Sequence, residues 1–172
     1  MKNFIEGRVW KFGDDVDTDI ICPSSKMHLP AKEILPFAFK AVRPGFYSRV
    51  QEGDVLVAGK NFGAGSSREG AAAVLKEMGI SACVVDSVGR IFFRNCIALN
   101  IPVVVQQNIS KHLNEGDHIR LDLLGGKISD ISTGEELDVH PLPKSLIQIL
   151  QAGGLSPLIR KVLKEKRSSR TV

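Results

Sequence analysis

The chain has 172 residues, which is enough for one domain with a hydrophobic core and short for two. Hydrophobic residues make up 43% and charged residues 24%, and the mean hydropathy is +0.02, a balance that excludes a disordered or membrane-embedded class. The net charge is +4, and we find neither an apolar run of membrane-spanning length nor a secretory leader at Met1. We therefore expect a cytoplasmic protein with no membrane partner.

The N-terminal part is expected to contain one strand followed by a long loop. Residues 7–12 alternate apolar and polar side chains and end at Gly13, which is typical of a strand. The region of about 22–47 contains four prolines: Pro23, Pro30, Pro36 and Pro44. We expect a long, partly helical loop there. Loops of this length are uncommon inside a compact domain unless they are functional, so we interpret it as an active-site loop.

The middle of the chain alternates strand and helix patterns. Strands are indicated by branched apolar runs, and helices by longer stretches that end at turn residues. The predicted order is strand 54–59, a glycine-rich turn, helix 66–78 closed by Gly79, strand 83–86, helix 89–99 and strand 102–106. This order predicts a parallel α/β unit with right-handed crossovers.

The C-terminal part has a different pattern. Residues 117–124 and 127–132 predict a hairpin around Gly125 and Gly126, and 141–151 and 155–166 predict two terminal helices. We found no internal repeat, so we expect a single domain over 1–172, with a tail of about 167–172 that frays. Much of the positive charge lies in 160–167, and no aromatic residues interleave with it. This pattern favours a solvated helix over a nucleic-acid site.

The three cysteines, Cys22, Cys83 and Cys96, are an odd number without a CxxC pair. A disulfide framework or a zinc site is therefore not expected. Cysteines that ligate an iron–sulfur cluster usually lie close together in one loop, and these do not. We predict no metal site on this chain, and we assign any cluster to another subunit.

The most informative segment is 59–69, Gly-Lys-Asn-Phe-Gly-Ala-Gly-Ser-Ser-Arg-Glu. It is expected to connect the end of a strand to the start of a helix. Such a junction collects unpaired backbone N–H groups and the positive end of the helix dipole, so it binds anions such as carboxylates. Gly63 and Gly65 would let the backbone approach a ligand closely, and Arg68 adds a planar group suited to a carboxylate.

A purely structural interpretation of the same segment stays open on pattern alone. Ser66 and Glu69 have the spacing of a capping box, in which the serine caps the helix and the glutamate reaches back to it. The segment is not a P-loop, because the Gly-Lys-Ser/Thr ending is absent, and it lacks the third glycine of a dinucleotide fingerprint. Anion binding and helix capping are therefore the two readings of this junction.

The run Gly-Lys-Asn-Phe-Gly-x-Gly-Ser-Ser-Arg-Glu resembles the signature of the swivelling domain of the aconitase superfamily. Three further stretches agree with it in the same order: 7–21, 87–95 and 149–155. The resemblance covers nearly the whole chain and is nearest to the small subunits of 3-isopropylmalate dehydratase and homoaconitase. It implies an α/β swivelling domain in three β/β/α layers, with a parallel α/β core and an added hairpin.

The same resemblance implies an activity and a partner. The family removes and re-adds water on hydroxy di- or tricarboxylates, with a [4Fe–4S] cluster held by a separate large subunit. By position, Ser66 would be the catalytic base and would take a proton next to a carboxylate. Arg68 would bind a substrate carboxylate, Ser67 would support it through hydrogen bonds, and Gly63 and Gly65 would shape the loop.

Two other segments are candidates for the site. Asp17, Thr18 and Asp19 form an acidic turn that could bind a metal or act in acid–base chemistry, or could cap turns and orient neighbouring residues. In the family, the loop corresponding to 26–29 tunes the choice of substrate. We interpret Lys26 and His28 as possible carboxylate readers, with an apolar lining by Met27 and Leu29 as the alternative that we favour.

Several positions depart from the family pattern or resist assignment. Ala64 stands where the family has Cys or Glu, and Gly70 where it has His. Arg90 and Arg94 could reach an interface or a substrate, although solvent exposure is the more frequent fate of such residues.

We expect a 3-isopropylmalate dehydratase small subunit. The alternatives are a paralogue for homocitrate or a dimethylmalate, and a non-catalytic anion-binding protein of the same fold.

Overall fold

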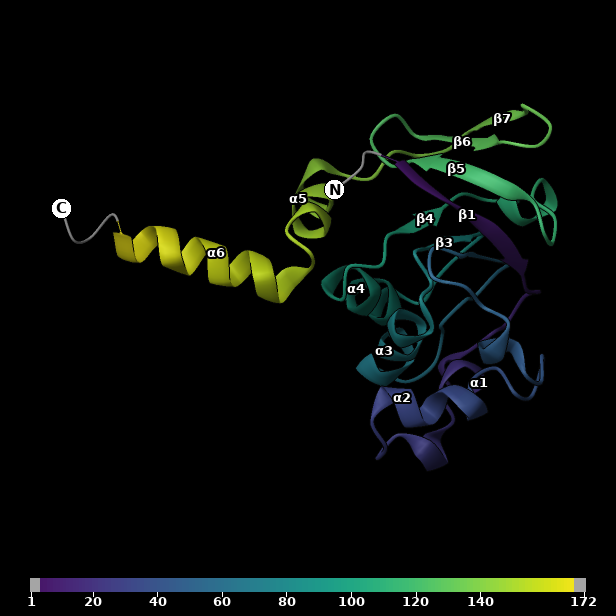
Figure 1. Cartoon of the computed structure of the whole chain (residues 1–172), viewed down its shortest axis with the longest axis horizontal. Helices are drawn as coiled ribbons and strands as arrows, with labels where there is room; N and C mark the ends of the chain where they lie inside the picture. The colour runs from purple at the N-terminus through teal and green to yellow at the C-terminus, as the bar shows by residue number, and fades with distance from the viewer. Residues whose placement is uncertain (1–3, 169–172) are drawn as a thin grey trace.

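The computed structural model describes residues 4–168 (Figure 1). Seven strands form one curled sheet in the order β4-β3-β2-β1-β5-β6-β7. The strands are β1 (Phe4–Lys11), β2 (Val55–Ala58), β3 (Ala82–Val85), β4 (Val103–Val105), β5 (His118–Asp122), β6 (Lys127–Asp130) and β7 (Glu136–Asp138). The predicted strands are all present, with ends that differ by a few residues.

One half of the sheet is parallel. β1 pairs with β2 in the register Val9 to Val55, β2 with β3, and β3 with β4. Every residue of β2 and β3 is buried, which explains why their sequences are continuous apolar runs instead of alternating patterns. The expected parallel α/β core is confirmed.

The other half is antiparallel. β5 pairs with β1 and then with β6, as the hairpin prediction requires. The connection from β5 to β6 is four residues long, because the strands end at Asp122 and resume at Lys127. β7 was not predicted, and its three residues, Glu-Leu-Asp, are too few and too polar to show a strand pattern.

The sheet is covered on both faces, which confirms the three-layer expectation. The two long helices of the core, α3 (Glu69–Met78) and α4 (Arg90–Ala98), pack on one face together with the N-terminal loop. On the other face, the curled antiparallel strands and α5 (Lys144–Gln151) enclose a second core that includes Val57, Ile119 and Ile128 (Figure 1).

The long loop is partly helical, as expected. It follows α1 (Thr18–Ile21) and contains α2 (Ala31–Ile34) and three short 3₁₀ helices, η1 (Ser24–Lys26), η2 (Leu35–Phe37) and η3 (Phe46–Ser48). Phe39 and Phe46 are fully buried and pack edge to face 5.1 Å apart. These aromatic contacts fasten the loop to the core, so it is an ordered wall beside the sheet.

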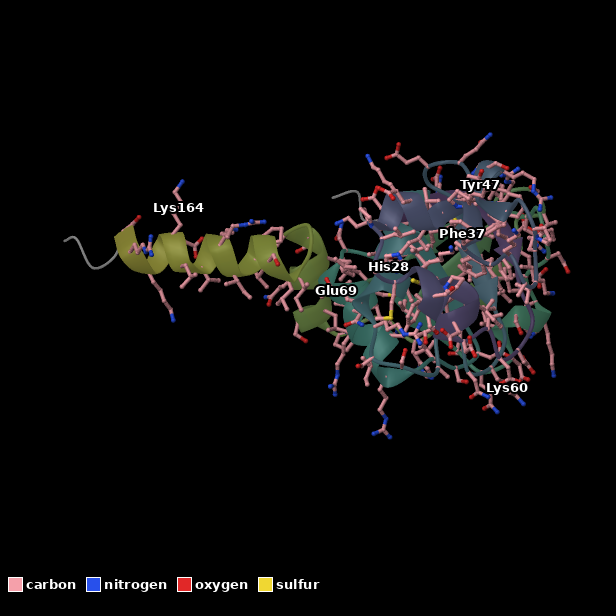
Figure 2. The ribbon with its side chains drawn as sticks, turned by 90° about the horizontal axis from the view of Figure 1, so that it is seen from below. His28, Phe37, Tyr47, Lys60, Glu69 and Lys164 are labelled. Carbon is pink, nitrogen blue, oxygen red and sulfur yellow. The ribbon has the colours of Figure 1, made fainter. Side chains whose placement is uncertain are left out.

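The C-terminal helix α6 (Leu155–Ser168) projects away from the body of the molecule (Figure 1). None of its residues is buried, and Lys164 points into solvent (Figure 2). The helix runs two residues beyond its predicted end at 166, and residues 169–172 of the expected frayed tail lie outside the described residues. Among residues 4–168, none of the helices combines the length and apolar composition that a membrane span requires.

Candidate functional site

The candidate site lies where the parallel strands end. Because β1, β2 and β3 run in the same direction, the segments that follow them emerge at one edge of the sheet. These segments are 12–19, 59–68 and 86–89. Hydrogen bonds join them, since Gly63 N donates to Val16 O at 2.8 Å and Phe62 N donates to Ser87 O at 3.0 Å. The fold thus brings together motifs that lie about fifty residues apart in sequence.

Two glycines allow the loop to close in this way. Gly63 has a φ of +63°, and a Cβ atom there would lie 2.3 Å from the ring of Phe92. Gly65 has a φ of +114°, and a Cβ atom would lie 2.9 Å from Thr18 Oγ1. Both conformations disfavour L side chains, and both neighbours are too close for one. The glycines therefore permit close packing of the loop against α4 and α1.

Helix α3 begins later than predicted. It starts at Glu69, and Arg68 is the N-cap residue with an extended backbone. The capping-box reading of Ser66 and Glu69 is therefore wrong. The physical reason is the positive φ of Gly65 and the contact with Thr18, which hold Ser66 outside the helix.

Ser66 is an exposed residue, and its hydroxyl lies next to a buried threonine. Ser66 N donates to Thr18 Oγ1 at 3.2 Å, and the two hydroxyl oxygens are 3.4 Å apart. Thr18 N in turn donates to Ala64 O at 2.9 Å. The backbone N–H groups of Ser67, which precedes α3, and of Glu69, its first residue, have no acceptor within residues 4–168. Ser66 therefore lies beside unpaired donors at a helix N-terminus.

Arg68 is held in place by the acidic turn. Its Nη1 atom donates to Asp19 Oδ1 at 2.7 Å and to Cys22 O at 3.4 Å. The Arg68 side chain is 18% exposed, and its Nε and Nη2 atoms have no acceptor within the described residues. Hydrogen bonds from Ser24, and then the bond from Arg68, lower the pKa of Asp19 below its ordinary value. The pair is therefore charged at neutral pH and leaves two Arg68 donor atoms available.

The acidic turn orients its neighbours. Asp17 caps α1, because its Oδ1 accepts from Asp19 N at 2.9 Å and from Ile20 N at 2.8 Å. α1 thus presents Thr18 to Ser66 and Asp19 to Arg68. Within residues 4–168 no three His, Cys, Asp or Glu side chains are grouped to hold a metal ion. The hydrogen bonds of Asp17 and Asp19 are those expected of the orienting role of the turn.

The two predicted substrate readers are not joined to this cluster by contacts. The ammonium of Lys26 lies 4.6 Å from the ring centre of Phe37, over a hollow of about 350 Å³ that Asp19 also lines. His28 is exposed and makes no hydrogen bond or ion pair within the described residues. Leu29 packs partly against the core, whereas Met27 is 56% exposed. The apolar lining of the substrate pocket by Met27 and Leu29 therefore stays a prediction.

The two arginines of α4 lie outside the candidate site's hydrogen-bond network, whereas two serines support it. Arg90 and Arg94 on α4 are exposed and have no ion-pair partner in the part of the chain that the structure describes. Sequence reasoning did not single out Ser24 and Ser87, which support the site. Ser24 hydrogen-bonds Asp19, and the hydroxyl of Ser87 accepts from Asn61 N at 2.8 Å. Only their positions, after the acidic turn and at the start of the segment 87–95, could have identified these two serines from the sequence.

The three cysteines are buried in one hydrophobic cluster. Burial raises the pKa of the Cys83 thiol to about 12 and also raises the pKa values of Cys22 and Cys96. At neutral pH these thiols are therefore protonated.

Comparison with known proteins gives consistent results. The Aconitase C-terminal domain family matches residues 26–108. The isopropylmalate/citramalate isomerase small subunit of Methanocaldococcus jannaschii is 42% identical over 168 residues, which are 97% of this chain and 100% of that protein. The homoaconitase small subunit of Methanothermobacter thermautotrophicus is 40% identical over 156 residues, covering 90% of each chain.

A solved structure agrees with the sequence comparison. The crystal structure of 3-isopropylmalate dehydratase from Methanocaldococcus jannaschii superimposes with a TM-score of 0.86 at 35% identity, covering 95% of this chain and 99% of that one. Relatives at about 40% identity over their full length share both fold and reaction class. This chain therefore belongs to the aconitase-type hydro-lyases, as a member of the 3-isopropylmalate dehydratase and homoaconitase small-subunit family.

Proposed function

We propose that this chain is the small subunit of a two-subunit 3-isopropylmalate dehydratase and that Ser66 is its catalytic base. The observation that carries the proposal is the arrangement of Ser66 and Arg68. The hydroxyl of the exposed residue Ser66 lies two residues from a guanidinium that keeps two donor atoms available, at the N-terminus of a helix. The relatives are named as small subunits, which supports a separate large subunit as the partner.

The reaction needs groups of the kind found here. Removing water from a 2- or 3-hydroxy acid requires a base for the proton on the carbon next to a carboxylate, and a cation to hold that carboxylate. Ser66 would take the proton, and the electron pair of the broken C–H bond would form the double bond as the hydroxyl leaves the adjacent carbon. Arg68 would bind the carboxylate through Nε and Nη2, while Ser67 would contribute a hydrogen bond.

The iron–sulfur cluster is assigned to the large subunit. Within residues 4–168 no three His, Cys, Asp or Glu side chains are grouped to hold a metal ion, and the three cysteines are buried. When bound in the partner, the cluster would supply a Lewis acid for the substrate hydroxyl. The residues of this chain would then supply the base and the carboxylate clamp, so the active site would be complete only at the interface between the two subunits.

The preferred substrate is proposed to carry an apolar side group. Met27 is exposed in the loop that would tune the choice of substrate, and an exposed methionine can provide an adaptable apolar contact to a ligand. The Lys26 ammonium lies 4.6 Å from the ring centre of Phe37, and this contact would compete with the recognition of a third carboxylate. A homocitrate-type substrate is the alternative, since a homoaconitase small subunit is also among the relatives.

Reconstitution with a large subunit tests the proposal. The complex should be assayed with isopropylmalate, citramalate and homocitrate under anaerobic conditions, at equal concentrations. The highest kcat/KM with isopropylmalate is the expected result. Turnover of homocitrate alone would overturn the substrate assignment, and turnover of none of them would indicate another hydroxy acid, such as a dimethylmalate. Near wild-type turnover after replacement of Ser66 by alanine would overturn the assignment of the base.

A further inference from the structure

Thr18 is a buried polar residue whose hydroxyl contacts only Ser66 within the described residues. The residue is 2% exposed, at the start of α1, and its position is fixed by the bond from its own N–H to Ala64 O. Its hydroxyl oxygen accepts from Ser66 N at 3.2 Å. A buried hydroxyl also has a hydrogen to donate, and buried donors are nearly always paired.

The acceptor for that hydrogen is Ser66 Oγ. It is the only acceptor in hydrogen-bond contact with Thr18 Oγ1 within residues 4–168, at 3.4 Å. The oxygen of Thr18 is already engaged as an acceptor for Ser66 N, so the direction from Thr18 to Ser66 satisfies both hydroxyls best. Gly65 makes this approach possible, since a Cβ atom there would lie 2.9 Å from Thr18 Oγ1.

From this geometry we infer that Thr18 is a positioning residue that donates a hydrogen bond to Ser66 Oγ and stabilises its deprotonated form. The inference rests on the proposed role of Ser66 as the base. The proton of Thr18 stays on Thr18, while Ser66 alone exchanges a proton with the substrate. A separation of 3.4 Å is long for two neutral hydroxyls, and hydrogen bonds to a charged oxygen are shorter and stronger, so the contact should tighten when Ser66 is deprotonated.

The consequence is a lower pKa for the base. One hydrogen bond to a charged group is commonly worth a shift of about one to two pH units. Removing it should therefore displace the rising limb of the kcat–pH profile to higher pH by about that amount. At a fixed pH on that limb, kcat should fall about 10- to 100-fold, while KM should stay within about twofold because Arg68 is untouched.

Thr18→Val tests the inference in the reconstituted complex, because valine keeps the shape and removes the hydroxyl. The matched control is Thr133→Val, which changes an exposed threonine in the turn between β6 and β7 and should leave kcat unchanged. Thr18→Ser should restore most of the lost rate. Should the valine variant not assemble, Thr18→Ala removes the same hydroxyl without adding bulk and is held to the same expectation.

The outcomes separate this inference from the proposed function. A reduced kcat with a displaced pH profile, restored by serine, supports it. Wild-type kcat in Thr18→Val would overturn it, as would equal losses in the serine and valine variants. A parallel rise in KM with an unchanged pH profile would also overturn it, since that result indicates a purely structural role. If the wild-type complex itself has no hydro-lyase activity, it is the proposed function that fails.

Discussion

Replacing Arg68 by lysine tests how this chain holds its substrate. Arg68 already uses Nη1 for Asp19 and Cys22 O, and it keeps Nε and Nη2 for a ligand. Lysine has one ammonium group and cannot donate in two directions within one plane. The variant should therefore either keep the contact with Asp19 or bind the substrate carboxylate, but not do both with good geometry.

The expected loss of substrate-binding free energy follows from that geometry. One charge-assisted hydrogen bond contributes about 1.5–3 kcal/mol, which corresponds to a rise in KM of about 10- to 150-fold. The free energy of unfolding should change by less than about 1 kcal/mol, because the Arg68–Asp19 pair is partly exposed, at 18% and 55% for the two side chains. The effect on binding should therefore greatly exceed the effect on stability.

Steady-state kinetics of the reconstituted complex, together with thermal unfolding of the isolated chain, measure both quantities. Arg120→Lys is the matched control, because Arg120 forms an exposed ion pair with Glu6 at 2.6 Å on the antiparallel half of the sheet. The control should leave KM unchanged. A KM for Arg68→Lys within about twofold of the wild type would refute the assignment of Arg68 to the substrate carboxylate.

Three further predictions concern the loop, the acidic turn and the thiols. Gly65→Ala should destabilise the chain by about 1–3 kcal/mol and lower turnover, because it adds backbone strain and a clash with Thr18. The control is Gly134→Ala, because Gly134 also has a positive φ, +76°, but has open space around it; this variant should leave turnover unchanged. In an NMR titration, Ser24→Ala should raise the pKa of Asp19 toward its ordinary value; an unchanged pKa would contradict the assigned cause. The three cysteines should resist a thiol reagent in the folded chain and react after denaturation, and rapid labelling of the native chain would contradict their burial.

The pH dependence of the Arg68–Asp19 contact has a definite sign. The pKa of Asp19 is lowered in the folded chain, chiefly by Ser24 and then by Arg68. The contact therefore contributes its small stabilisation above the ordinary pKa of an aspartate, near 3.8. That contribution is lost as the pH falls through the lower value of the folded state. Neutral and mildly acidic conditions should leave the site intact.

Sequence patterns predicted the sheet and its helices well because burial leaves a periodic signal. β2 and β3 are continuous apolar runs, and α3 ends at Gly79 with the positive φ expected of a C-terminal glycine. β7 left no such signal, since a strand of three residues with one apolar side chain has no period.

The site was predicted in part. Glycines and an arginine at a strand–helix junction marked the segment from Gly63 to Arg68 as an anion-binding candidate, but pattern alone left helix capping open. The roles predicted for Ser66 and Arg68 came from the resemblance to the aconitase superfamily. The start of α3 was misplaced because a contact forty-eight residues away, from Thr18 to Ser66, overrides a local capping pattern. The pairing of Arg68 with Asp19 likewise depends on tertiary contact and has no local sequence signal.

The most direct measurement of the central claim is turnover by complexes that contain wild-type or Ser66→Ala chains, alongside each subunit alone. Formation of the unsaturated acid can be followed by its ultraviolet absorbance. Only the wild-type complex should turn over, with Ser66→Ala assembling normally, binding substrate with a similar KM and losing about 10²–10⁴-fold in kcat. Activity of this chain alone, or wild-type turnover by the Ser66→Ala complex, would contradict the account of a shared active site with Ser66 as its base.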